Sequence, residues 1–335
     1  MKKSTLALAA IATLASGAAM AQSSVTLYGR VNTSVERQKV DGENSSSMVD
    51  NSSRWGLKGT EELGGGLKAS FLLESGFKSD TGAGAGGFGR ESWVALESAS
   101  AGKVRLGNVS ATALYFATAD YISMHNHDTG SSADAFYFYQ GTSTDTIAYT
   151  SPSFGGLVVE AQFGLNDGAG RRTKVLAANY DAGPLHVGGG YVDGTDGSGL
   201  GGDRAKQFGV RGLYELGAVT LGAYYINDKI EDDLGNDAKR NTFRVSAMYT
   251  MGASEFHGNL GWAGKIKANG TSQDGTDARQ LTLGYNYNLS KRTKVYAFYT
   301  RIDNKENIAY ALGGGQSAKD GTDPSSIAVG VRHNF

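Results

Sequence analysis

Sixteen segments of this chain alternate apolar with polar or small residues, and they are joined in turn by tight turns and long polar loops. In one of them Phe243, Val245 and Ala247 share a face, while Arg244 and Ser246 share the other. Alternation with a period of two predicts β-strands that have one apolar face. We therefore expect strands at residues 25–37, 53–62, 67–77, 88–98, 104–109, 143–152, 157–165, 172–181, 185–193, 204–215, 218–227, 239–250, 254–264, 278–289, 293–302 and 325–335.

The connections between these segments alternate in length along the chain. Turns of a few residues, such as 63–66, 153–156 and 251–253, lie between long polar loops such as 38–52 and 303–324. Short turns on one side and long loops on the other are typical of an up-and-down membrane barrel. A soluble β-sandwich has no reason to keep this asymmetry over so many hairpins.

Many charged residues fall on the face opposite the apolar one. In a dry core each of these ions would be costly unless it were paired, whereas on the wall of a water-filled lumen they cost little. A barrel of about sixteen strands is also too wide for side chains to fill. The sequence thus predicts an all-β fold, a 16-stranded antiparallel up-and-down transmembrane β-barrel, whose lumen-facing charges are Arg30, Arg54, Lys58, Glu74, Glu91, Arg105, Glu160, Arg211, Arg244 and Arg332.

The amino terminus has the pattern of a secretory signal peptide. Lys2 and Lys3 precede an apolar run at 6–14, and the residues at 19–21 (AMA) have the small-x-small form of a cleavage site. The run is too short to span a membrane. We therefore expect residues 1–21 to be removed on export and residues 22–335 to form the barrel.

The composition narrows the class of protein further. The chain has no cysteine, so disulfide bonds cannot stabilise it outside the cytoplasm. Its 49 glycines and only 3 prolines suit continuous strands with tight turns. The formal net charge is −1, which gives no reason to expect nucleic-acid binding.

One connection, at about 110–140, is too apolar and aromatic for a freely solvated loop. It contains aromatic runs at 114–116 and 136–139. The inside of a wide barrel offers such a loop a wall to pack on, and packing on a neighbouring subunit is the alternative. We expect the loop to fold into the lumen, where Asp120, Asp128 and Asp134 would face basic wall residues and create a transverse field.

Aromatic residues also occur near the strand ends, where a membrane barrel has its interfacial girdles. Ordinary β-propensity is the alternative explanation. The residues concerned are Tyr28, Trp55, Tyr180, Tyr191, Tyr214, Trp262, Tyr287, Tyr299 and Phe335.

Four stretches resemble the general porins of Gram-negative bacteria, in particular the subgroup typical of β-proteobacteria. They are residues 25–29 (VTLYG), 53–69 (SRWGLKGTEELGGGLKA), 149–156 (YTSPSFGG) and 329–335. The resemblance covers the whole mature chain and implies a homotrimer of sixteen-stranded barrels in the outer membrane, with the third long loop at the constriction. It also implies that Phe335 belongs to a signal read by the barrel-assembly machinery.

The charges that would set ion selectivity match this family less closely. Arg54 matches a constriction arginine, but Glu91 stands where some anion-preferring relatives carry an arginine. Arg90 shares the parity of the apolar face in the alternation. With Arg30, Lys58 and Arg105 as compensating charges, we expect weak selectivity and favour neither sign.

The function that the resemblance implies is a general-diffusion porin, which passes ions and small hydrophilic solutes and contacts outer-membrane lipid and lipopolysaccharide. A channel specific for a sugar or an organic anion is one alternative, and a secreted or adhesive β protein is another. We expect no enzyme and no cofactor, because no local motif supports a Ser/His site. A metal site at His125, His127 and Asp128 is the less favoured interpretation of a polar loop.

Overall fold

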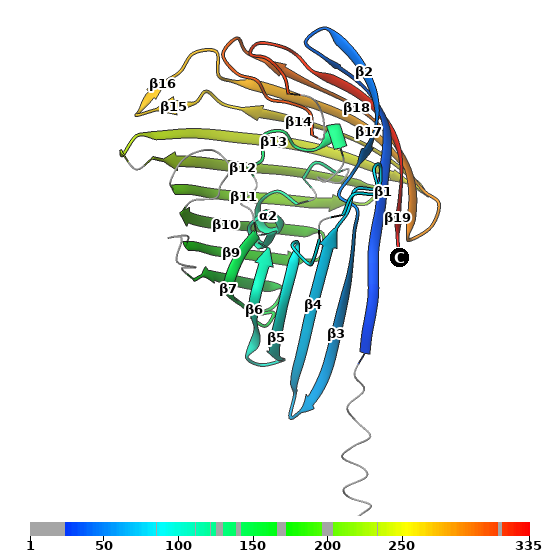
Figure 1. The fold of residues 1–335 in the computed structure, drawn as a ribbon, viewed down its shortest axis with the longest axis vertical. Helices are drawn as coiled ribbons and strands as arrows, with labels where there is room; N and C mark the ends of the chain where they lie inside the picture. The colour runs from blue at the N-terminus through cyan, green and yellow to red at the C-terminus, as the bar shows by residue number, and fades with distance from the viewer. Residues whose placement is uncertain are drawn as a thin grey trace, which may run out of the picture.

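The protein folds into one closed antiparallel sheet, with a long loop inside it (Figure 1). The computed structural model describes residues 24–84, 86–110, 112–120, 122–124, 130–138, 142–165, 172–195, 204–232, 234–313 and 317–335. The expected signal peptide, residues 1–21, lies outside these ranges. None of the helices within them has the length and apolar character that crossing a membrane requires.

The barrel closes where β1 (Ser24–Val40) pairs with β19 (Ser325–Asn334). The strands between them pair in chain order. They are β4 (Leu67–Gly76), β5 (Glu91–Ser98), β6 (Gly102–Ser110), β7 (Thr142–Thr150), β8 (Leu157–Gly164), β9 (Arg172–Ala182), β10 (Leu185–Thr195), β11 (Arg204–Leu216), β12 (Val219–Glu231), β13 (Asp237–Met251), β14 (Ser254–Ala263), β17 (Ala278–Asn288) and β18 (Thr293–Asn304).

Four further strands complete the sheet, and they add one strand to the barrel. β2 (Glu43–Asp50) and β3 (Arg54–Gly64) pair with the two halves of β1 and together form one barrel strand. β15 (Lys267–Ala268) and β16 (Thr271–Ser272) form a small hairpin in the loop after β14. The barrel therefore has sixteen strands, as predicted.

The first long loop, expected at 38–52, is instead a hairpin. Asp41 and Gly42 have φ values of 51° and 86° and form a two-residue turn between β1 and β2. Two consecutive positive φ angles suit the twist of a hairpin, and Asp-Gly is a favoured pair for them. The expectation was wrong because the polar composition of β2 resembles that of a loop.

The two faces of the sheet divide as the alternation predicts. In β1, Asn32, Ser34 and Glu36 are buried inside the barrel, whereas Val31 and Val35 on the outer face are 38% and 59% exposed. Large apolar side chains are exposed on the outer face of strand after strand. The outer surface is therefore apolar and the interior polar, as in a barrel that spans a membrane.

Phe335 closes the seam of the barrel at the end of β19. Its backbone exchanges two 3.0 Å hydrogen bonds with the backbone of Gly29. A Cβ atom on Gly29 would lie 2.4 Å from the Phe335 ring, so the ring covers the space that glycine leaves. Glycine at this position allows the close approach.

One aromatic residue expected on the outer face lies on the inner one. Tyr28 has the parity of Arg30, and its hydroxyl donates a 2.9 Å hydrogen bond to Glu74. Its assignment to an interfacial girdle was therefore wrong. Other predicted girdle residues, among them Tyr191, Tyr214 and Tyr287, are exposed on the outside.

Candidate functional site

The long loop between β6 and β7 folds into the lumen, as expected. It contains α2 (Thr112–Thr118) and the short 3-10 helix η1 (Gly130–Ser132). α2 packs on the inner face of β9 to β12, and η1 packs against β18 and β19 (Figure 1). We call the described residues of this segment, 112–120, 122–124 and 130–138, the inward loop.

Glycines on the inner face of the wall allow α2 to approach it closely. A Cβ atom on Gly188 would lie 2.4 Å from the carbonyl oxygen of Ala117, and one on Gly209 would lie 2.9 Å from Cβ of Thr118. Contacts this short would force the helix away from the wall. These glycines were not identified from the sequence, although three consecutive glycines at 188–190 inside a strand were a signal of close backbone approach.

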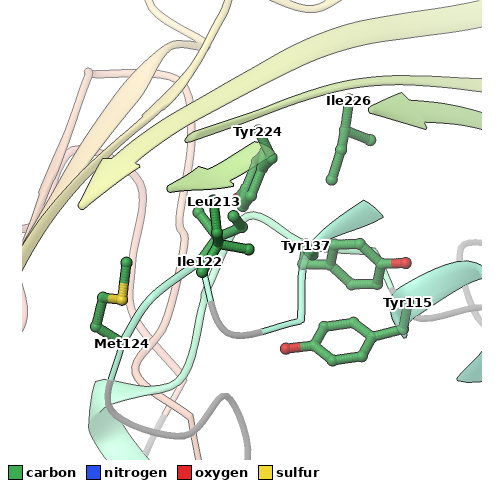
Figure 2. Packing of buried hydrophobic residues seen from close by; sticks show 8 residues of the cluster. Tyr115, Ile122, Met124, Tyr137, Leu213, Tyr224 and Ile226 are labelled. Atoms are coloured by element: carbon green, nitrogen blue, oxygen red, sulfur yellow. The ribbon is translucent and has the colours of Figure 1, made fainter. Parts of the chain in front are cut away.

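An apolar cluster joins the inward loop to β11 and β12 (Figure 2). Tyr115 and Tyr137 of the loop meet edge to face at 5.0 Å between ring centroids. Ile122 is fully buried beside them. Burial of apolar area on both partners stabilises the loop in its inward position, and the wall residues of the cluster are Leu213, Tyr224 and Ile226.

A buried ion pair fixes the second half of the loop. Arg244 of β13 donates to both carboxylate oxygens of Asp134, at 2.6 and 3.0 Å, and also to Gln280 at 2.7 Å. The Tyr224 hydroxyl donates to the same carboxylate. Burial acts to raise the pKa of Asp134, but the charge of Arg244 and the donated hydrogen bonds hold it below its ordinary value.

This pairing differs from the role expected for Asp134. The Arg244 side chain is 1% exposed and that of Asp134 is 5% exposed, so neither faces an open channel. The alternation correctly placed Arg244 on the inner face, but it could not show that the loop would reach it. Asp134 therefore contributes to holding the loop rather than to a field across a gap.

A second segment, residues 308–312, also packs inside the barrel, against the inward loop. The Tyr310 ring meets Phe136 edge to face at 4.8 Å. Arg240 connects the two segments, because it donates to the Tyr310 hydroxyl and to the Phe136 carbonyl oxygen, both at 2.7 Å. Arg240 also pairs with Asp228 at 2.8 Å. Residues 303–324 were expected to form a long polar loop, so this contact was not predicted.

Across the lumen, the inner face of β3 to β8 carries ion pairs that are accessible to water. Glu74 pairs with Arg90 at 2.7 Å and with Arg54 at 3.8 Å. The two arginine side chains are 40% and 26% exposed. Arg90 was wrongly assigned to the apolar face, because β5 begins at Glu91 and strict alternation does not extend to the residue before it.

The other predicted charges of this wall lie close to these pairs. Glu91 accepts a 2.6 Å hydrogen bond from the Trp93 indole. Arg105 pairs with Glu160. The exposed Lys58 ammonium lies 5.1 Å from the centroid of the Tyr28 ring. We call this set the open wall, and its charged members are Arg54, Lys58, Glu74, Arg90, Glu91, Arg105 and Glu160.

The remaining predicted site residues have different surroundings. Arg30 donates to the carbonyl oxygens of Ser52 and Asn51, at 3.0 and 3.3 Å, where β2 gives way to β3. Asp120 is buried, and its carbonyl oxygen accepts a hydrogen bond from Arg211.

The possible metal ligands cannot be placed in this way. Asp128 lies outside the described residues, with His125 and His127. Within the described ranges, no group of three or more His, Cys, Asp or Glu side chains is arranged to hold a metal ion.

Comparison with known proteins matches this architecture over nearly the whole chain. A family model described as Gram-negative porin matches residues 7–307. The outer membrane porin protein 32 of Delftia acidovorans is 35% identical over 100% of both chains, and a P.IB major outer membrane protein of Neisseria meningitidis is 27% identical over the same share. Among solved structures, an anion-selective porin from Comamonas acidovorans superposes with a TM-score of 0.75 at 26% identity, covering 94% of this chain and 100% of that one.

Proposed function

We propose a route for solutes through this chain, which belongs to the Gram-negative porin family. The protein is an outer-membrane channel for the passive diffusion of ions and small hydrophilic solutes. The inward loop lies against β9 to β12 and is held by Arg244 of β13. We place the conducting path between this loop and the open wall, with Arg54, Arg90 and Glu74 at the constriction. The main support for this path is that the ion pairs of the open wall are accessible to water, whereas Arg244 and Asp134 behind the loop are buried.

We further propose that the channel prefers anions weakly. Arg244 neutralises Asp134, so the loop supplies less negative charge than the sequence suggests. Among the described lumen residues considered for the constriction, the basic ones outnumber the acidic ones. The basic ones that are not buried are Arg54, Lys58, Arg90, Arg105 and Arg211, and the acidic ones are Glu74, Glu91 and Glu160. A modest excess of positive charge in a narrow aqueous path raises the local concentration of anions.

Reversal potentials in a salt gradient across a planar bilayer test this proposal. We expect a small anion preference in the wild type and a shift toward cations in Arg54→Gln, because Glu74 then loses one of its two arginines. Glu74→Gln should shift the potential the opposite way. A strong cation preference in the wild type, or the same potential in all three proteins, would contradict the proposal.

The assembly that we propose is a homotrimer, and a polar patch on the outside of the barrel supports it. The Ser79 hydroxyl, in the loop after β4, is hydrogen-bonded on the outer face to the carboxylate of Asp50 at 2.8 Å and to the hydroxyl of Thr33 at 2.6 Å. Polar groups are costly where they face lipid. A neighbouring subunit would cover them. Asp50→Ala should therefore lower the temperature at which the trimer dissociates, measured by gel mobility of samples heated to increasing temperatures. A wild-type protein that runs as a monomer without heating would refute the trimer.

Three further features belong to this proposal. We expect contact with lipopolysaccharide and assembly by the barrel-assembly machinery through a signal that includes Phe335. We expect no catalytic activity and no cofactor.

A channel specific for a sugar or an organic anion would show a conductance that one solute saturates and blocks, whereas a general channel would show a current proportional to salt concentration.

A further inference from the structure

An indole ring lies among the charges of the open wall, on the inner face of β5. Val94 and Leu96 are exposed on the outer face, so the alternation places Trp93 on the inner one. The Lys103 ammonium lies 5.0 Å from the centroid of the Trp93 ring, and Cζ of Arg105 lies 5.7 Å from it. Both distances are within the range of cation–π attraction. Together with the hydrogen bond from the indole N–H to a carboxylate of the same strand, these contacts fix the ring in one orientation.

Trp93 belongs to a short apolar strip that crosses three strands of this wall. On β4 it lies opposite Leu72, and on β6 it lies opposite Gly107, which adds no side chain beside the ring. Trp93 and Leu72 are both partly exposed. Water in the lumen therefore meets an apolar surface here, between the charged groups of the open wall.

A cation without a carboxylate partner stands at one end of the strip. Lys58 lies opposite Leu72 on β3. Its side chain is exposed, and it takes part in no ion pair with the residues that the structure describes. The two cations beside Trp93 differ in this respect, because Arg105 pairs with Glu160 and Lys103 lies 3.5 Å from the carboxylate of Glu97. Lys58 is therefore the cation that is available to an anionic solute.

The inward loop presents a second aromatic ring to the lumen. Phe116 of α2 is 45% exposed, whereas Leu114 and Thr118 are buried against the wall. Two residues along a helix correspond to a rotation of about 200°, so Phe116 points to the opposite side of α2 from Leu114 and Thr118. Since α2 lies inside the barrel (Figure 1), this side faces the lumen.

These groups indicate which solutes the path would retain. Aromatic rings attract a flat aromatic solute more than contact area alone explains, and a free ammonium group attracts an anion. Lys58 and Trp93 stand two strands apart, about 10 Å across the sheet. The long side chain of Lys58 shortens this gap to the size of one ring with an attached carboxylate. A neutral aromatic solute would make no use of Lys58, and an aliphatic anion would make no use of the rings.

We propose that the open wall contains a weak binding site for aromatic carboxylates, formed by Trp93, Leu72 and Lys58, with Phe116 contacting the solute from the inward loop. This inference rests on the proposed function, because it takes the conducting path to run between these two surfaces. The site raises the concentration of such solutes at the constriction, and its weakness lets them leave on the other side.

Two probes of equal charge and similar size test the site. Benzoate has a π face, whereas cyclohexanecarboxylate has none and is the more apolar of the two. Single-channel conductance of the purified protein is measured in rising concentrations of each potassium salt, which gives the concentration at half-saturation. We expect half-saturation by benzoate at a concentration about threefold to tenfold lower, whereas apolar contact alone would favour the cyclohexane ring.

Substitutions assign the preference to particular side chains. Trp93→Leu and Phe116→Leu should each remove most of it, because leucine keeps apolar bulk but has no π face, and Trp93→Phe should retain part of it. Trp262→Leu is the matched control, because Trp262 stacks on Phe243 on the outer face at 5.6 Å between ring centroids, and it should keep the wild-type preference. Lys58→Gln should weaken the binding of both carboxylates by a similar factor.

The results that would overturn the site differ from those that would overturn the channel. Equal half-saturation concentrations for the two probes in the wild type would overturn the proposal, as would a benzoate preference that survives in both Trp93→Leu and Phe116→Leu. Conductance in potassium chloride, measured on the same samples, shows that each variant forms a channel. A wild type that conducts chloride but does not distinguish the probes contradicts the binding site alone, whereas a wild type with no conductance contradicts the proposed function as well.

Discussion

At the scale of single residues, the contact between Arg244 and Asp134 determines how firmly the inward loop is held. Arg244→Ala would leave the Asp134 carboxylate buried and without its guanidinium, a loss worth about 3 to 5 kcal/mol when a buried pair is broken. The loop should then leave its position part of the time. We expect noisier open-channel currents in planar bilayer recordings, with the barrel itself still resistant to unfolding in detergent.

An exposed arginine serves as the control for that change. Arg301 pairs with Asp303 and Asp323, but its side chain is 45% exposed, and surface pairs contribute about 0 to 1 kcal/mol. Arg301→Ala should therefore leave the current trace unchanged. If the open-channel currents of Arg244→Ala and Arg301→Ala showed equally little noise, the ion pair between Arg244 and Asp134 would not be what holds the loop.

At the scale of elements, the position of α2 depends on the absence of side chains on the wall behind it. Gly188→Ala adds a Cβ atom that would lie 2.4 Å from a backbone oxygen of α2, so the helix must move toward the open wall. We expect a smaller single-channel conductance. Gly212→Ala is the matched control, because the nearest atom to its Cβ lies 3.9 Å away, and a conductance reduced equally in both variants would exclude the explanation.

The same elements show what could be predicted from the sequence and what could not. The strands were predictable because alternation repeats in every one of them, and the inward loop because its aromatic residues needed a wall. The strands on which the loop packs were not predictable. Gly188 contacts α2, and Arg244 pairs with Asp134, only after distant strands are brought together. Tyr28 and Arg90 were misplaced for a different reason, which is local: Tyr28 shares the parity of Arg30, and Arg90 precedes the first residue of β5.

At the scale of the whole molecule, the barrel is held together by its seam as well as by its hairpins. β1 and β19 are about 300 residues apart in sequence, so their pairing closes the largest loop in the protein and carries the largest entropic cost of closure. Phe335 adds two backbone hydrogen bonds and a ring contact on Gly29 at the end of this seam. The last strand therefore affects closure more than any single hairpin does.

Phe335→Ala separates closure of the barrel from conduction through it. The backbone hydrogen bonds to Gly29 can still form, but the ring that covers Gly29 is lost, so closure and insertion should become slower or less complete. The lumen charges are untouched, so the pores that do form should conduct normally. We expect less folded protein in the outer membrane by gel mobility, with unchanged single-channel conductance. His333→Ala, on the same face two residues earlier, should insert like the wild type, and normal insertion of Phe335→Ala would remove the proposed role of the ring in assembly.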